Sequence, residues 1–194
     1  MNTKIRNSTL NILLIALLGA FLWWGERNLD GYQIQVLNLI AVNAILALSL
    51  NLIYGFTGMF SLGHAGFMAI GAYVSALLIL SPAQKEMMWI LEPVIWPFSV
   101  MHAPFLVSVI AGGLAAALIG LLIALPVLRL GGDYLGIATM GFAEIIRVVI
   151  TNITPITNGS LGLKGIPDYA GLWWNFGWFL FTLYFMLRLV NSNF

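Results

Sequence analysis

The chain has 194 residues, of which 61% are hydrophobic and 8% are charged, and its formal net charge is +1. Soluble domains carry about 25% charged residues, so this composition argues against a soluble enzyme. A disordered chain would need low hydrophobicity with high net charge, and a nucleic-acid-binding protein would need a strongly basic surface. The chain contains no cysteine, which excludes disulfides, thiolate nucleophiles and zinc–sulfur sites. The composition predicts a protein whose solvent is membrane lipid.

Long apolar runs predict the fold. A transmembrane helix needs roughly 20 mainly apolar residues to cross about 30 Å of hydrocarbon. We therefore predict an all-α, polytopic transmembrane helical bundle of about six spans, forming a single domain over residues 1–194 with no soluble domain. The predicted spans are Leu10–Trp24, Gln33–Tyr54, Leu62–Leu80, Phe105–Leu128, Tyr134–Ile153 and Leu172–Val190.

The first span is short, and its basic flank also fits a secretory signal. Trp23 and Trp24 are typical of anchors at the membrane surface, and no small-residue cleavage site follows them, so we expect an uncleaved span. Lysine and arginine placement favours a cytoplasmic N-terminus and, with an even number of spans, a cytoplasmic C-terminus. The cytoplasmic cations are then Lys4, Arg6, Arg129 and Arg188, against Arg27, Lys85 and Lys164 outside.

The loops differ in kind. Ser81–Pro104 is long and interrupted by prolines, which predicts an outer segment that lies along the membrane surface and does not cross it. Gly131–Asp133 predicts a tight inner turn, and Pro155–Gly171 predicts an outer loop with an Asn-Gly turn signal.

Between the second and third spans, four glycines interrupt an otherwise apolar stretch: Gly55, Gly58, Gly63 and Gly66. Backbone broken in this way is used by transporters to build a gate or a binding site, although a plain inner turn is the alternative. Ser61 is expected to cap the next helix by accepting a hydrogen bond from the backbone N–H of Gly63 or His64. His64 is either a proton switch or a helix-end histidine, and alone it is no metal site.

Glu144 and Arg147 lie three residues apart in the fifth span, so they share a helix face that Thr151 continues. A rise of about 1.5 Å per residue places Glu144 near the middle of the membrane. An isolated charge there costs roughly 2.5–3.5 kcal/mol or more, so both groups are expected to face protein or water. Three interpretations remain open: an ion pair that locks helices together, a lining of a transport path, and a proton relay.

Polar and small residues in two other spans predict helix packing. Asn38, Asn43, Ser49 and Asn51 in the second span are expected to bond to neighbouring helices, with a polar pathway as the alternative. In the fourth span, small residues recur every four positions and allow another helix to approach closely. These are Gly112, Ala116, Gly120 and Ala124.

Motifs for catalysis are missing from the sequence. It contains no Gly-x-x-x-x-Gly-Lys-Ser/Thr loop for ATP hydrolysis, no His-Glu-x-x-His zinc motif and no Gly-x-Ser-x-Gly elbow. The two histidines, His64 and His102, are assigned to opposite sides of the membrane. We therefore expect no catalytic residues and no bound metal.

Two stretches carry a resemblance to a known family. Residues 51–73 read NLIYGFTGMFSLGHAGFMAIGAY, and residues 125–147 read LPVLRLGGDYLGIATMGFAEIIR and continue into residues 152–167. Both resemble the signature of bacterial branched-chain amino acid ABC importer permeases, and the second resembles the M-type subunit of the two that such importers pair. The resemblance covers about Leu37 to Val190.

The resemblance implies a division of labour in the bacterial inner membrane. A homologous second permease subunit completes the path, two cytoplasmic ATPase subunits use ATP, and an extracytoplasmic binding protein delivers the amino acid, so this chain needs no cofactor. An aliphatic substrate would enter an apolar pocket, with its zwitterionic head at backbone dipoles of helix ends. The implied path or gate elements are the broken segment, with Gly58, Ser61, Gly63 and His64, and the face of the fifth span that carries Thr139, Glu144 and Arg147.

Members of this family normally continue past Phe194, so the sequence is expected to be an N-terminal fragment or a truncated product of a longer permease. Within the family, the alternative is a urea or short-chain amide permease. From other classes, the alternatives are a secondary transporter that uses Glu144 in proton or ion coupling, and a membrane scaffold that transports nothing.

Overall fold

The computed structural model describes residues 3–89, 92–130 and 133–191, with side chains from residue 13 onward except that of Asp133. All regular elements in these ranges are helical, which confirms the all-α prediction. The chain forms two compact units, Met1–Leu52 with Ala170–Phe194, and Ile53–Tyr169. The side chains of Lys4 and Arg6 and most of the predicted turn Gly131–Asp133 lie outside the described residues.

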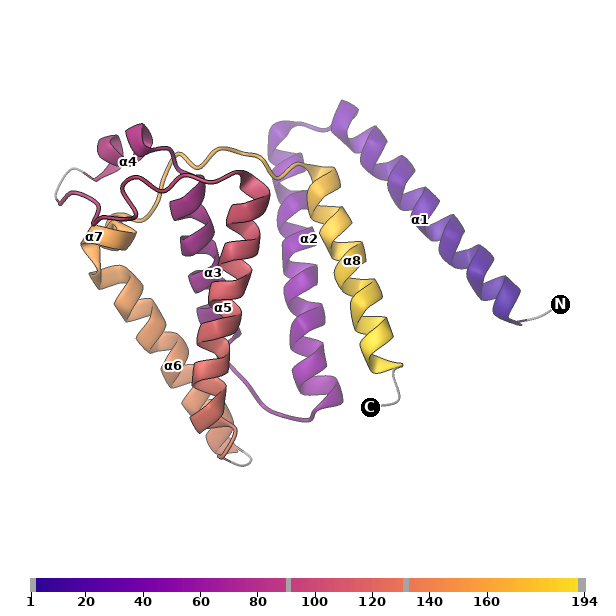
Figure 1. Cartoon of the computed structure of the whole chain (residues 1–194). Helices are drawn as coiled ribbons and strands as arrows, with labels where there is room; N and C mark the ends of the chain where they lie inside the picture. Colours follow the sequence, from indigo (N-terminus) through magenta and orange to yellow (C-terminus); the bar gives the residue numbers. More distant parts are fainter. Residues whose placement is uncertain (1–2, 90–91, 131–132, 192–194) are drawn as a thin grey trace. The chain divides into compact units, whose positions relative to one another are not determined.

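The first unit contains α1 (Thr3–Asn28), α2 (Gly31–Asn51) and α8 (Leu172–Val190). The helices α2 and α8 pack side by side along their lengths (Figure 1). At the start of α2, the side chain of Gln33 accepts a hydrogen bond from the backbone N–H of Asp30 at 3.2 Å. This bond gives the N–H of the N-cap residue a partner. The helix α1 is tied to α8 where Trp173 Nε1 donates to Glu26 Oε2 at 2.8 Å.

The second unit is built around α3 (His64–Ile79), which packs against both α5 (Phe105–Val127) and α6 (Asp133–Asn152) (Figure 1). Its contact with α5 is the most extensive in the described chain. Gly112 makes this possible, because a Cβ at this position would lie 2.5 Å from the carbonyl oxygen of Gly71 and would also collide with Ser75 Oγ. The two backbones thus approach more closely than any side chain at residue 112 would allow.

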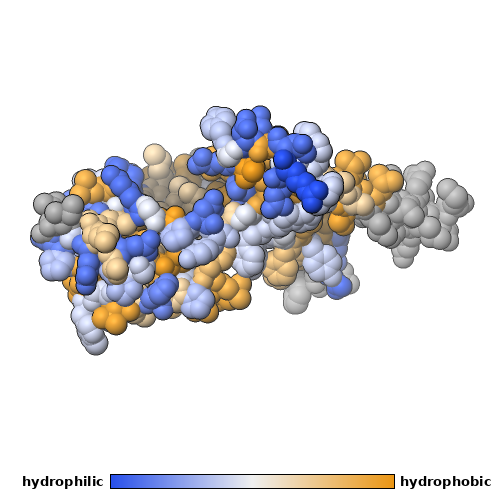
Figure 2. Space-filling model, turned by 90° about the horizontal axis from the view of Figure 1, so that it is seen from above, coloured by the Kyte–Doolittle hydropathy of each residue, from blue (hydrophilic) through white to orange (hydrophobic). Residues whose placement is uncertain are grey.

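A cluster of short elements covers one end of α3, α5 and α6. It contains α4 (Pro82–Met88), α7 (Thr154–Thr157) and the 3₁₀ turn Gly159–Leu161. Trp89 Nε1 donates to the carbonyl oxygen of Thr154 at 3.0 Å, and the backbone N–H of Ala103 donates to the carbonyl of Leu78 at 2.8 Å. Figure 2 looks onto this end of the helices and shows hydrophilic side chains gathered there among apolar ones.

Among the described residues, fewer helices qualify as membrane spans than the predicted six. In the described ranges, three helices are long and apolar enough to cross a membrane: Gly31–Phe56, Phe105–Val127 and Tyr134–Asn152. A fourth is reached only if α3 and α4, bent by 114° at their junction, count as one span. The predicted span Leu62–Leu80 falls short because its helix begins at His64 and has 16 residues, about 24 Å at 1.5 Å per residue.

Candidate functional site

The glycine-broken segment, residues 57–63, separates α2 from α3. After Asn51 the chain passes through a π-helical turn, Leu52–Phe56, and then has no regular structure until His64. Gly58 has φ +66°, a conformation that glycine adopts without strain. Tyr54 packs edge-on against Phe60, with ring centroids 5.3 Å apart, and its hydroxyl donates to the carbonyl of Ser61 at 2.8 Å. These contacts fold the segment back on the π-helical turn.

Thr139 holds the broken segment against α6. Its hydroxyl accepts a hydrogen bond from the backbone N–H of Leu62 at 2.9 Å and donates to the carbonyl of Gly136 at 2.9 Å. The side chain is buried, and its position is about 9 Å along α6 from Asp133 at 1.5 Å per residue. The segment therefore lies beside the interior of a membrane-spanning helix, where irregular backbone is tolerated only against protein or water.

The predicted cap at Ser61 is wrong. Gly63 occupies the N-cap position with φ −79° and ψ −3°, and no side chain caps the helix. Instead, Ser61 contributes its carbonyl to the bond with Tyr54. The physical reason is that Tyr54 and Thr139 fix the backbone at Ser61 and Leu62, so that the helix starts one residue after Gly63 and not directly after Ser61.

Two glycines bring α3 against α6. A Cβ at Gly63 would lie 3.2 Å from the carbonyl oxygen of Thr139, and a Cβ at Gly66 would lie 3.1 Å from Cα of Ala143. Gly63 and Gly66 are both buried, and His64 between them is half-buried at the first position of α3. His102 belongs to the loop before α5 and lies near the C-terminal end of α3, with Nδ1 3.4 Å from the carbonyl oxygen of Leu78.

An apolar cavity of about 170 Å³ lies beside the broken segment. Ser61 and Thr139 are the polar residues in its wall, and helices α5 and α6 supply most of the rest. Its other lining residues include Ile53, Met59, Phe67, Ile123, Val127 and Leu135. Such a wall accepts an aliphatic group and offers few polar contacts.

Glu144 and Arg147 form the predicted ion pair. Arg147 donates from Nε to Glu144 Oε2 at 2.9 Å and from Nη2 to Glu144 Oε1 at 2.5 Å. The Glu144 and Arg147 side chains are 57% and 65% exposed, so no other part of the described chain covers the pair. The neighbouring positions of α3 are Ala65, Gly66 and Ala69, which are too small to cover it.

The pair lines a groove of about 450 Å³ between α3 and α6. Tyr73, Ile150 and Thr151 lie at one end of the groove, and Ala65 and Gly66 lie at the other. Thr151 continues the face as predicted, with its hydroxyl bonded to the carbonyl of Arg147 at 3.0 Å. Thr139 does not belong to this groove, because its side chain turns toward the broken segment. Of the predicted path residues, Ser61 and Thr139 line the cavity and Glu144 and Arg147 line the groove. Gly58, Gly63 and His64 line neither.

The residues predicted to pack helices are found in two settings. A Cβ at Gly71 of α3 would be 3.7 Å from Ala116, and a Cβ at Gly120 would be 3.7 Å from Phe67, so the small-residue stripe of α5 lies along α3. Asn43 behaves differently, because its amide donates to the carbonyl of Leu39 in its own helix at 2.8 Å. Asn51, the last residue of α2, is exposed.

Sequence reasoning missed Lys85. This lysine was expected in an outer loop, and it is 1% exposed, with Nζ donating to the carbonyls of Phe98 at 2.7 Å and Met101 at 2.6 Å. Burial lowers the pKa of Lys85 below its ordinary value. The local signal was the capping box of Ser81 and Gln84, which starts α4 and so places Lys85 in a helix and not in a loop. Its partners lie 13 and 16 residues away, which no local pattern indicates.

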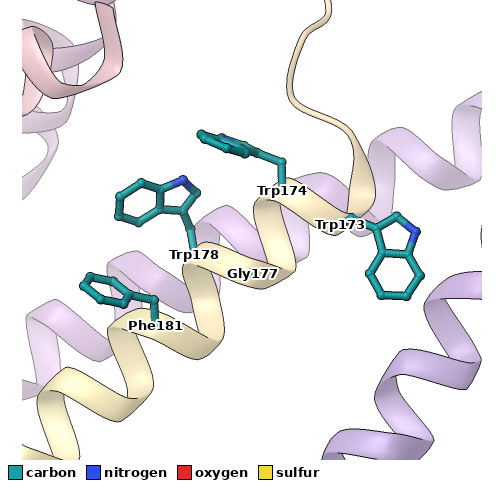
Figure 3. Close-up of a pocket in the computed structure, with 5 residues that line it drawn as sticks. All are labelled: Trp173, Trp174, Gly177, Trp178 and Phe181. Carbon is teal, nitrogen blue, oxygen red and sulfur yellow. The ribbon is translucent and has the colours of Figure 1, made fainter. Parts of the chain in front are cut away.

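The surface of α8 carries an aromatic cluster (Figure 3). Trp174, Trp178 and Phe181 lie along one side of the helix, whereas Trp173 points to the other. The rings of Trp174 and Trp178 are 6.0 Å apart, and those of Trp178 and Phe181 are 5.5 Å apart. Such rings are typical of contacts with lipid near the membrane surface. Within the described part of the chain, no group of three or more His, Asp or Glu is placed to hold a metal ion.

Apolar spanning helices, a short helix interrupted at membrane depth and a charged groove define a multi-pass helical membrane protein of the transporter type. The chain belongs to the family described as "Branched-chain amino acid transport system / permease component", whose profile matches residues 32–192. This membership makes it a multi-pass protein of the inner membrane.

Two curated relatives carry the same name, high-affinity branched-chain amino acid transport system permease protein LivM. The relative from Escherichia coli K12 is 35% identical over 189 residues, which cover 94% of this chain and 40% of the relative. The relative from Salmonella typhimurium LT2 is 36% identical over 156 residues, covering 80% of this chain and 32% of the relative. This chain thus spans less than half the length of both. No solved structure matches it.

Proposed function

We propose that this chain forms part of the membrane path of an ATP-driven importer for branched-chain amino acids. The family match carries the proposal, because residues 32–192 include both the broken segment and the ion-paired helix α6. The chain acts as a transport subunit and not as an enzyme, in keeping with the names of its two relatives.

The broken segment, residues 57–63, is the proposed gate. Transporters commonly bind and release substrate where a membrane helix is interrupted, since irregular backbone there changes conformation without breaking a helix. Here the segment is attached to α6 through Thr139 and adjoins an apolar cavity of about 170 Å³. A cavity of this character suits the aliphatic side chain of leucine, isoleucine or valine.

The partners are part of the proposal. No phosphate-binding loop of the Gly-x-x-x-x-Gly-Lys-Ser/Thr type is present in these 194 residues, so energy would come from two cytoplasmic ATPase subunits. A homologous second permease subunit would complete the path, and an extracytoplasmic binding protein would deliver the substrate. In this arrangement both termini of the chain are cytoplasmic, as the lysine and arginine distribution favours.

The alternatives are less well supported. Both relatives are named for branched-chain amino acid transport, which does not favour a urea or short-chain amide permease. Coupling to protons through Glu144 is not favoured either, because no other carboxylate or histidine lines its groove.

The test is uptake by the organism that carries this chain. Deleting its coding sequence should abolish high-affinity uptake of labelled leucine, isoleucine and valine, while uptake of urea and acetamide stays unchanged. Complementation with the intact gene should restore uptake, and depletion of ATP with the membrane potential maintained should abolish it again. Unchanged branched-chain uptake in the deletion strain would refute the proposal, and ATP-independent uptake would favour a secondary transporter.

A further inference from the structure

The ion pair in the α3–α6 groove has a geometry that a purely structural role does not explain. Both members belong to α6, three residues apart, so the pair links no two helices within the described chain. Both side chains are more than half exposed, near the middle of a membrane-spanning helix. Charges at that depth are costly in lipid, so this groove is built to meet something polar.

From this we infer that the groove recognises the zwitterionic head of an α-amino acid, with Arg147 binding its carboxylate and Glu144 binding its ammonium group. The inference rests on the proposed function and names the residues that read the substrate's charges. It also differs from the expectation that backbone dipoles at a helix end hold the head.

Charge balance supports this role. Without substrate, the two bonds between Arg147 and Glu144 neutralise both ions. With a zwitterion bound, the substrate's carboxylate takes the place of Glu144 beside the guanidinium, and its ammonium donates to the released Glu144 carboxylate. The groove stays neutral in both states, so neither state leaves an unpaired charge in the membrane.

The shape of the groove fits a small head group. Ala65, Gly66 and Ala69 form the α3 wall and leave space beside the pair. Toward the other end, Tyr73 reaches the outer loop, because a Cβ at Gly162 would lie 3.9 Å from its hydroxyl oxygen. The groove therefore extends from the loop after α6 to the pair at the level of Ala69, which gives a substrate a polar entry lined by Tyr73 and Thr151.

The pair also predicts a specific pattern of discrimination. A ligand with only a carboxylate would leave Glu144 without its cation, and one with only an amine would leave Arg147 without its anion. Each charged hydrogen bond lost in this way weakens binding by about 10- to 100-fold. Three probes of similar apolar shape separate the two charges: L-leucine, 4-methylpentanoate, which lacks the ammonium, and 3-methylbutylamine, which lacks the carboxylate.

The experiment measures equilibrium binding of these three probes to the permease complex, purified from its host into lipid nanodiscs. Wild type should bind L-leucine at least about tenfold more tightly than either analogue. In Glu144→Gln, L-leucine should bind no better than 4-methylpentanoate, and in Arg147→Gln no better than 3-methylbutylamine. A merely structural role would weaken all three probes alike.

Glu86→Gln and Arg129→Gln are matched controls, because they remove exposed charges outside the groove and should keep the wild-type ranking. If a groove variant fails to accumulate, Glu144→Asp or Arg147→Lys takes its place, since each keeps the charge but shifts it and should narrow the preference for L-leucine over the analogue lacking the partner charge. Equal binding of the three probes to wild type, or equal losses in both groove variants, would overturn the inference. Such a result leaves the proposed function intact, since that is tested separately by uptake in the deletion strain.

Discussion

The close contact between α3 and α5 predicts that Gly112→Ala destabilises the protein. The new Cβ would lie 2.5 Å from the carbonyl oxygen of Gly71, closer than the 3.0 Å that Cβ atoms respect, and would also meet Ser75 Oγ. The serine side chain has some freedom, but the Gly71 backbone does not, so the helices must separate. Overpacking of this kind costs about 1–3 kcal/mol.

Gly113→Ala is the matched control, because a Cβ at Gly113 meets nothing within 4 Å. Both variants gain about 1 kcal/mol of helix propensity at most, so their difference isolates the clash. We expect the free energy of unfolding of Gly112→Ala, measured in detergent by tryptophan fluorescence, to be about 1–3 kcal/mol lower than that of Gly113→Ala. Adding Ser75→Ala should restore only part of the loss, since the Gly71 carbonyl remains. Equal stability of the two glycine variants would refute the reasoning.

Three other substitutions probe contacts in the second unit. Thr139→Val should loosen the broken segment at a cost of about 1 kcal/mol, because it leaves the Leu62 N–H without its acceptor. In a Met59→Cys background, Thr139→Val should therefore speed thiol labelling of the cysteine, whereas Thr139→Ser should not. Equal labelling rates would show that this hydrogen bond does not hold the segment. Lys85→Met removes two charged hydrogen bonds, each of which contributes about 1.5–3 kcal/mol, so it should cost about 3 kcal/mol or more. It should also expose residues 97–101 to protease, whereas Lys164→Met, at an exposed position, should not. Protease resistance equal to that of wild type would speak against a structural role for Lys85. Gly66→Ala should lower the unfolding temperature, because its Cβ would lie 3.1 Å from Ala143 Cα. Gly71→Ala is the control and should be tolerated, because the nearest atom to its Cβ would be 3.5 Å away. A lower unfolding temperature for Gly71→Ala than for Gly66→Ala would contradict the observed packing.

The sequence predicted those features that depend on local spacing. Glu144 and Arg147 pair because residues three apart share a helix face, and the glycines between α2 and α3 do mark a break. The same arithmetic also separates Thr139 from the pair. A residue five positions from Glu144 is rotated by about 140° around the helix. The prediction that one face of this span carries Thr139 together with Glu144 and Arg147 was therefore wrong.

Features set by distant partners were not predictable. Nothing near Ser61 indicates that Thr139 would hold the adjoining backbone, 77 residues away from Leu62. The burial of Lys85 likewise depends on carbonyl groups in a later loop. The Glu144–Arg147 pair is exposed because the side chains of α3 beside it are small. The sequence contains these small residues, but only the fold shows that they lie next to the pair on α6.

The interlocked glycine contact has a consequence for motion during a transport cycle. Because the backbones of α3 and α5 touch at Gly71 and Gly112, sliding or rotation of one past the other would force atoms to overlap. The two helices must then travel as a single rigid body. Any hinge that serves this body has to lie elsewhere. Residues 57–63 have no regular structure and are attached to α6 by the hydrogen bond from Leu62 and by packing of Phe60 on Gly136, so the flexible joint is expected there.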